Sequence, residues 1–129
     1  MSESTNGQST IASKPYHRMH GDAAQLAIRL RSVIPEQGVV ILVSGLGKNH
    51  GSNQVAMRLS QSLVSLYEYR RVLLIDADIT NAGIDAFFEL NATKGIADAV
   101  LADADIADIV NTSAVPKLSI LPAIDRDKV

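Results

Sequence analysis

The stretch SGLGKNHGSNQ, residues 44 to 54, has residue types and spacing suited to holding a phosphate group. Gly45, Gly47 and Gly51 allow the tight backbone turns that bring successive N–H groups onto one anion. A helical pattern begins near Ser52, so the free N–H groups and the positive dipole end of that helix would face the same loop. Lys48 is the one lysine of the stretch. The pattern indicates an anion cradle built mainly from backbone.

A second stretch, VLLIDADIT, places two carboxylates directly after an apolar run. Asp76 and Asp78 would lie at the carboxyl end of a strand, which is the functional edge of an open α/β sheet. Taken alone, such a pair is more simply explained as ending the strand and capping the turn that follows.

The elements that would position these groups follow from apolar periodicity. Val39–Val43 is a bounded, continuous apolar run, which predicts a central strand covered on both faces. A helix should begin near Ser52, capped by Ser52 or Asn53. Its apolar residues recur at helical spacing: Val55, Leu59, Leu63, Leu66 and Tyr67.

Further helices are predicted over 22–33, 95–101 and 105–110, and further strands over 72–75 and 117–121. Strands that alternate with helices build parallel βαβ units. The expected fold is therefore α/β, a mainly parallel sheet with flanking helices.

Composition bounds the rest. The chain has 129 residues, 47% of them hydrophobic, which is enough for one domain with a real core. Residues 1–20 are polar and are expected to form a disordered tail before an α/β domain over 21–129. The formal charge of −2 gives no basic field for nucleic acid, and no apolar run is long enough to cross a membrane. A chain without cysteine fits the cytoplasm.

From about Gln25 to Ala123 the sequence resembles the cytoplasmic P-loop domains of bacterial tyrosine autokinases of capsule and exopolysaccharide biosynthesis, relatives of the deviant-Walker partition ATPases. The strongest part is RRVLLIDADITNAGIDAFFELNATKGIADAVLADADIADIV, followed by LSILPA. The residues that keep the family's order are Val72 to Asp78, Phe88, Leu90, Gly95, Ile96 and Leu101.

The resemblance implies a partial P-loop NTPase-like fold and a nucleotide site for ATP or ADP with Mg²⁺. It implies that Asp76 and Asp78 form the acidic motif that binds or orients Mg²⁺ and the attacking group. It also implies that Gly45, Gly47, Lys48, Gly51, Ser52 and Asn53 form the phosphate loop.

The phosphate loop departs from the family at its catalytic lysine. Counting from Ser44 places that lysine at Gly51, and counting back from the following helix places it at Ser52. Lys48 lies three or four residues too early. His50 is a candidate phosphate contact in the same loop, although a lone histidine in a polar loop is more often simply solvated. Because phosphoryl transfer depends on positioned charge, we expect catalysis to suffer more than binding.

Other family features are also reduced. The Glu-x-x-Arg-x-x-Arg oligomerisation signature reads Gln25-x-x-Ile28-x-x-Arg31, and the tyrosine-rich tail has no equivalent. The second core motif, a strand that would lie between Val39–Val43 and Val72–Ile75, is also missing. Either the sequence is a fragment, or the two strands pair directly, or another chain fills the gap, and a fragment or a partner is the favoured expectation.

The sequence therefore predicts a degenerate P-loop protein, a pseudokinase or pseudo-ATPase that regulates or scaffolds exopolysaccharide biosynthesis or secretion. Its partner would be a protein of the polysaccharide export or synthesis machinery, or a second copy. It would be cytoplasmic and reach the inner membrane only through a partner. The alternatives are an active autokinase or ATPase that uses Lys48 and Asp76, a partition-type positioning protein, and an α/β domain without a ligand.

Overall fold

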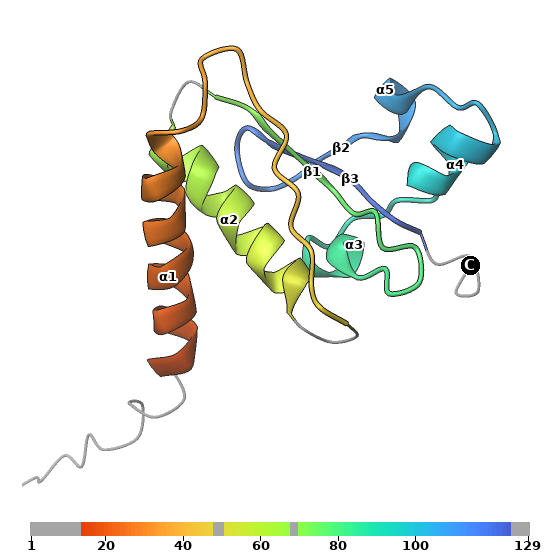
Figure 1. Cartoon of the computed structure of the whole chain (residues 1–129). Helices are drawn as coiled ribbons and strands as arrows, with labels where there is room; N and C mark the ends of the chain where they lie inside the picture. The colour runs from red at the N-terminus through yellow and green to blue at the C-terminus, as the bar shows by residue number, and fades with distance from the viewer. Residues whose placement is uncertain (1–13, 48–50, 68–69, 125–129) are drawn as a thin grey trace, which may run out of the picture.

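The computed structural model describes residues 14–47, 51–67 and 70–124 (Figure 1). Five helices and three strands form in this part of the chain. The helices are α1 (Lys14–Arg31), α2 (Ser52–Leu66), α3 (Ile84–Phe87), α4 (Ile96–Leu101) and α5 (Ile106–Ile109). The strands are β1 (Val72–Ile75), β2 (Asn111–Thr112) and β3 (Leu118–Leu121). The chain is an α/β protein, as the sequence predicts.

The sheet has the order β1-β3-β2. β1 pairs in parallel with β3, with Val72 opposite Leu118 and Ile75 opposite Leu121. β2 pairs with β3 in the antiparallel direction, so the expectation of a mainly parallel sheet is not confirmed. The connection between β2 and β3 is short, and a parallel crossover needs a dozen or more residues, so these two strands can only form a hairpin.

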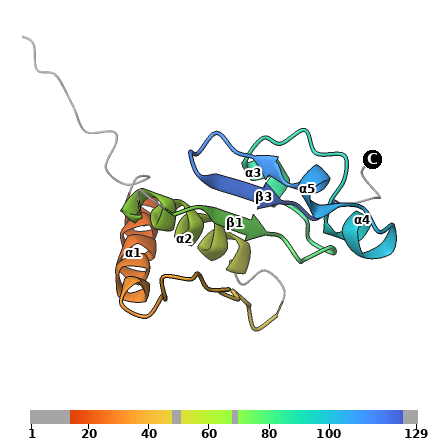
Figure 2. The same cartoon turned by 90° about the horizontal axis from the view of Figure 1, so that it is seen from above.

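The predicted central strand at Val39–Val43 is wrong. The segment forms no strand in the sheet, and the exposed fractions of Val40 and Leu42 are 94% and 87%. It lies on the side of β1 opposite to β3, apart from the sheet (Figure 2). A continuous apolar run makes a buried strand only where neighbouring strands can pair with it, and no described residue supplies that neighbour.

The two long helices lie side by side and run in the same direction, because the extended segment after α1 carries the chain back along them (Figure 1). α1 begins at Lys14, earlier than the predicted start at Asp22, so residues 14–20 of the predicted tail are helical. Residues 1–13 lie outside the described residues. Among the described residues, no helix combines the length and apolar character needed to cross a bilayer.

α2 is sandwiched between α1 and the sheet, so it buries two faces. Leu59 and Leu63 pack with Ala27 of α1, whereas Met57 and Val64 pack with the sheet. The predicted apolar face of α2 matches the first group only. Two of its members, Val55 and Leu66, are exposed.

α4 and α5 lie beyond the sheet, away from α1 (Figures 1 and 2), whereas Ile84 of α3 packs in the same cluster as Met57 of α2 and Leu74 of β1. α4 and α5 confirm the helices predicted over 95–101 and 105–110. Gly95 precedes α4 at a close backbone crossing, where the N–H of Ile96 donates to the carbonyl of Pro122 at 2.8 Å. A Cβ on Gly95 would lie 2.5 Å from that carbonyl oxygen, so only glycine fits without a shift.

Candidate functional site

A large open cavity, about 1110 Å³ in volume, separates the extended segment Val39–Val43 from β1 and lies over α2. It brings together most of the residues that the sequence marks for phosphate and metal chemistry. Those that line it are Gly45, Gly47, Ser52, Asn53, Asp76 and Asp78. Gly51 does not line it, and Lys48 and His50 lie outside the described residues.

The residue immediately before α2 is a glycine, which has no side chain to cap the helix. Gly51 precedes the helix in the left-handed conformation, with φ 72° and ψ 15°, and no side chain caps the helix end. The predicted capping by Ser52 or Asn53 is therefore wrong, because both residues already lie inside the helix. Among the described residues no side chain caps the first N–H groups of α2, and together with the helix dipole these groups favour an anion at this end.

Two of the three loop glycines adopt backbone conformations that favour glycine. Gly47 has φ 150° and Gly51 has φ 72°, a region that side chains with a Cβ rarely enter. A lysine in place of Gly51 would be strained in this backbone. The conformation of the loop therefore depends on its glycines. One of them, Gly51, holds one of the two positions where the family's lysine is expected.

Asp76 is a buried carboxylate that is only half satisfied. Its side chain is 2% exposed, and its Oδ1 accepts a hydrogen bond from the N–H of Asp78 at 3.1 Å. Oδ2 is buried and has no hydrogen-bond partner. Burial raises the pKa of Asp76 above its ordinary value of 3.8, and the N–H groups of Asp78, Gly83 and Ile84 oppose that rise. An orphaned buried oxygen at a cavity wall calls for a ligand or a proton.

Asp78 has the opposite environment. Its side chain is exposed, and its Oδ1 accepts from the Thr80 hydroxyl at 2.7 Å, the Thr80 N–H at 3.2 Å and the Asn81 N–H at 3.1 Å. The Thr80 hydroxyl is the main reason that the pKa of Asp78 lies below its ordinary value. Asp78 therefore caps the turn after β1, as the simpler explanation of the acidic pair proposes, whereas Asp76 is held by the N–H of Asp78 through Oδ1 alone and leaves Oδ2 without a partner.

The pair fits a metal only together with a ligand that brings more oxygens. No group of three or more histidine, cysteine or acidic side chains comes together among the described residues. Mg²⁺ is commonly held by one or two carboxylates plus phosphate oxygens and waters. The unpaired Oδ2 of Asp76 fits the role of such a carboxylate ligand, and the exposed carboxylate of Asp78 lies two residues further along the chain.

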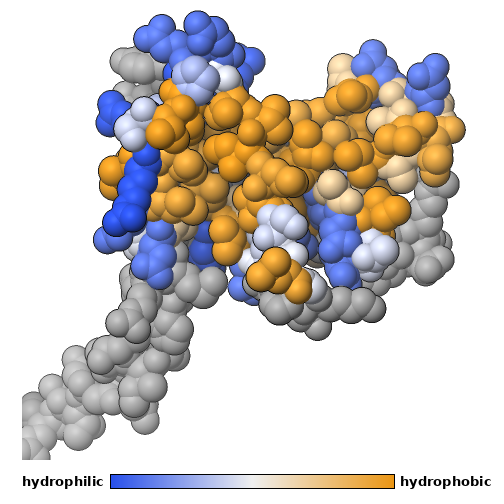
Figure 3. Space-filling view, viewed as in Figure 1, coloured by the Kyte–Doolittle hydropathy of each residue, from blue (hydrophilic) through white to orange (hydrophobic). Residues whose placement is uncertain are grey.

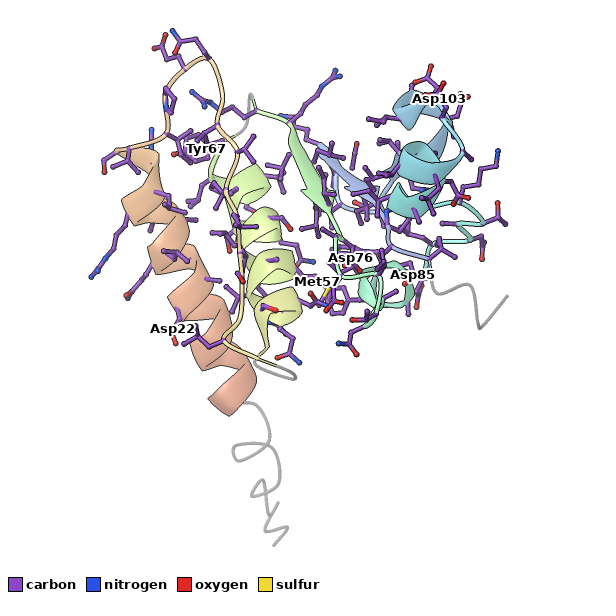
Figure 4. The ribbon with its side chains drawn as sticks, turned by 45° about the vertical axis from the view of Figure 1, so that its right-hand side comes forward. Asp22, Met57, Tyr67, Asp76, Asp85 and Asp103 are labelled. Carbon is purple, nitrogen blue, oxygen red and sulfur yellow. The ribbon has the colours of Figure 1, made fainter. Side chains whose placement is uncertain are left out.

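The far end of the cavity carries contacts that sequence reasoning did not anticipate. Arg70 donates a hydrogen bond from Nη1 to the carbonyl of Pro35 at 2.8 Å, which ties the start of β1 to the segment before Val39. Arg70 and Arg31 both lie over the ring of Tyr67, at 5.6 and 5.8 Å from its centroid. Figure 4 shows Tyr67 and Asp76 toward opposite ends of α2. In the sequence, the arginines of the stretch YRR, residues 69 to 71, were the one feature that pointed to contacts at this end of the cavity.

Comparison with known proteins gives a consistent result. No family model matches the chain. The tyrosine-protein kinase CpsD of Streptococcus agalactiae is 32% identical over 80 residues, which are 61% of this chain and 32% of that protein. The same kinase from the serotype III strain NEM316 matches equally. The chain thus spans about a third of the length of these relatives.

Two solved structures share the fold. The BceF tyrosine kinase domain superposes with a TM-score of 0.63 at 22% identity, over 84% of this chain and 40% of that one. The chimerical protein CapA2B2 superposes with a TM-score of 0.56 at 16% identity, over 94% of this chain and 49% of that one. Over part of its length the chain is therefore similar in sequence to bacterial tyrosine kinases, and it shares their fold, as its sequence motifs indicate.

Proposed function

We propose that this protein is a degenerate relative of the bacterial tyrosine kinases that regulates or scaffolds exopolysaccharide biosynthesis or secretion, with poor or no ATP hydrolysis. The observation that carries the proposal is the start of α2. The two positions where the lysine is expected hold Gly51, in a left-handed conformation, and Ser52, the first residue of the helix.

The loss of the lysine acts on catalysis more than on binding. A lysine at the start of the helix would place a compact positive charge on the β/γ-phosphate oxygens, where phosphoryl transfer gains most of its rate. The N–H groups of the loop and of α2 remain, because they do not depend on side-chain identity. Weak binding of an anion without turnover is the expected behaviour.

The acidic pair supports an origin in a nucleotide site. Asp76 has a buried oxygen without a partner at the cavity, an arrangement that costs stability unless a ligand or a proton supplies the partner. A bound Mg²⁺ would supply charge neutralisation for phosphate oxygens. Asp76 would hold it, with Asp78 as its exposed neighbour.

Nucleotide binding and turnover test the proposal directly. Calorimetric titration of Mg-ADP should show weak binding, and ATP turnover should stay at background for the wild type, Lys48→Ala and the matched control Lys94→Ala. Micromolar binding that Lys48→Ala weakens and Lys94→Ala leaves intact would favour the alternative of an active enzyme. Turnover that collapses in Asp76→Ala would overturn the proposal.

The role in the cell has a separate test. A strain without this protein should lose or mislocalise polysaccharide export, and Asp76→Asn should complement it, since a scaffold needs no catalytic carboxylate. Failure of a folded Asp76→Asn protein to complement, together with rescue by the wild type, would argue for catalysis. An unchanged polysaccharide with mispositioned cell machinery would instead favour the partition-type alternative.

A further inference from the structure

The two small helices α4 and α5 contact each other and present apolar side chains that no described residue covers. The exposed fractions of Val100 and Leu101, at the end of α4, are 76% and 75%, and that of Ile106, at the start of α5, is 53%. A single exposed apolar residue is ordinary, whereas several on one small surface mark a place of interaction. We call this the α4–α5 surface and include in it Asp103 and Asp108, which lie on the same segment.

The backbone of the α4–α5 surface is held by hydrogen bonds. The N–H of Ala102 donates to the carbonyl of Asp98 at 3.0 Å and ends α4. Asp103 turns the chain in the left-handed conformation, with φ 50°. The side chain of Asp105 then caps α5 by accepting from the N–H of Ala107 at 3.0 Å. The apolar side chains are therefore already positioned, and a partner that covers them has little backbone to order in this chain.

The charge of this surface has one sign. Residues 95–116 contain four aspartates, at positions 98, 103, 105 and 108, and no lysine, arginine or histidine. Asp103 and Asp108 are exposed, and neither is paired with a basic side chain of the described residues. Figure 3 shows hydrophobic and hydrophilic residues close together on this part of the molecule, and Figure 4 shows Asp103 at its outer end. Positive charge in an occupant is therefore favoured, whereas anionic lipids and nucleic acids are repelled.

A second copy of the chain fits this surface less well. The exposed large apolar residues of α1 are Leu26 and Ile28, and residues two apart lie on opposite sides of a helix. Leu26 lies with Asp22 and Arg29, whose charges cancel. Arg31, the basic residue one turn from Ile28, already lies over an aromatic ring. Within residues 21–31, α1 therefore offers no apolar face with a net positive charge.

We propose that the α4–α5 surface binds a basic amphipathic helix of a different protein. Apolar residues of that helix, spaced three and four apart, cover Val100, Leu101 and Ile106, and its lysines or arginines lie beside Asp103 and Asp108. A helix with an apolar stripe flanked by basic residues has this combination of properties. No residue of the surface lines the cavity, so the proposal does not rest on the proposed function.

A labelled peptide tests the surface. Lys-Leu-Ala-Lys-Leu-Leu-Ala-Lys-Leu-Ala-Lys gathers its leucines on one side of a helix and its lysines on another. It should bind the full chain in fluorescence anisotropy, more tightly than a version with glutamate at every lysine position and than a version with the same residues in an order that disperses the leucines. Binding should weaken as salt is added. In ¹⁵N-resolved NMR, the amides of Val100, Leu101 and Ile106 should shift.

Paired variants separate the apolar contribution from general stickiness. Leu101→Ser should weaken binding about tenfold or more, because it removes a side chain that the peptide buries. Val33→Ser is the matched control, since Val33 is equally exposed, at 70%, but follows α1. It should leave binding unchanged.

A second pair of variants tests the charge. Asp103→Asn with Asp108→Asn should weaken binding about fivefold and reduce its salt dependence. Asparagine tolerates the left-handed conformation of Asp103, so the turn is kept. Asp22→Asn with Glu36→Gln removes the same number of charges from exposed positions elsewhere and should leave binding unchanged.

Four results would overturn the proposal. The first is equal binding of the glutamate peptide, which would leave no role for the aspartates. The second is the absence of peptide binding by a folded chain. The third is a concentration-dependent dimer in sedimentation that Leu101→Ser abolishes, which would make a second copy the occupant. The fourth is binding to phosphatidylglycerol vesicles that Leu101→Ser abolishes, which would make a lipid surface the occupant.

Discussion

The backbone N–H of Asp78 donates a 3.1 Å hydrogen bond to Oδ1 of Asp76, so the exposed residue of the acidic pair orients the buried one. The two carboxylates are two residues apart and respond to opposite influences. Burial raises the pKa of Asp76, whereas the Thr80 hydroxyl lowers that of Asp78. Stability should therefore depend on pH with opposite sign at the two positions.

Replacing Asp76 by asparagine should stabilise the protein at neutral pH. A carboxyl whose folded pKa is raised contributes stability that is fully present below its ordinary value of 3.8 and is lost as pH rises through the folded pKa. The charge is then buried with one oxygen unpaired. Asp76→Asn removes the buried charge but leaves an unpaired amide in place of Oδ2, so the gain at pH 7 should be at most about 1–3 kcal/mol. Urea unfolding at pH 7 and near pH 4 should show a gain that shrinks at the lower pH.

Asp78→Asn is the matched control for this prediction. The folded pKa of Asp78 is lowered, so its contribution is present above its ordinary value and is lost as pH falls through the folded pKa. The asparagine variant should therefore lose stability at pH 7 relative to the wild type, and the loss should fade in acid. A gain at neutral pH in both variants would mean that general charge repulsion, and not burial of Asp76, explains the first result.

The hydroxyl of Thr80 should control the titration of Asp78. It donates to Oδ1 at 2.7 Å and is the leading cause of the lowered pKa. Thr80→Val keeps the shape of the side chain and removes this donor, so the pKa of Asp78 should rise toward its ordinary value. Carboxyl chemical shifts followed by NMR through an acid titration measure the change. An unchanged midpoint would assign the lowering to the backbone N–H groups of Thr80 and Asn81.

The sequence predicts a strand correctly where the fold supplies a neighbouring strand, and wrongly where it does not. The strands at 72–75 and 118–121 form where their apolar runs stand, because each finds the other as a parallel neighbour. The run at Val39–Val43 is equally apolar and equally bounded, but it has no such neighbour. An apolar sequence pattern shows that a segment can form a strand, whereas actual pairing depends on whether the fold places another strand beside it.

The candidate site divides in the same way. The sequence predicts that the loop glycines and the acidic pair lie together, and the cavity unites most members of that set, without Gly51. The different environments of Asp76 and Asp78 do not follow from spacing. They depend on the packing of α3 and on the turn closed by Thr80 and Asn81, which are contacts that periodicity does not encode.

Gly95→Ala should destabilise the fold. The added Cβ would lie 2.5 Å from the carbonyl oxygen of Pro122 and 2.8 Å from the nitrogen of Ile124. Backbone atoms cannot move aside as a flexible side chain can, so the cost in stability should be about 1–3 kcal/mol.

Gly21→Ala is the matched control, because Gly21 lies inside α1 with nothing near its Cβ position. It should gain about 0.5–1 kcal/mol from helix propensity. Thermal unfolding of both variants measures the contrast, and equal effects would contradict a close crossing at Gly95.

Truncating Ile120 should cost more than truncating any exposed apolar residue. Ile120 is fully buried in the middle of β3, with β1 on one side and β2 on the other, and it packs in the same cluster as Met57 and Leu74. Ile120→Ala removes apolar contacts on the helix side of the sheet and leaves a cavity, which should destabilise by about 2–5 kcal/mol, whereas Ile120→Val should cost about 0.5–1.5 kcal/mol. Val100→Ala, on the exposed face of α4, should stay within about 0.5 kcal/mol of the wild type. Denaturant unfolding resolves these values. A cost for Ile120→Ala no larger than for Val100→Ala would mean that the three-stranded sheet is not the core that holds the chain together.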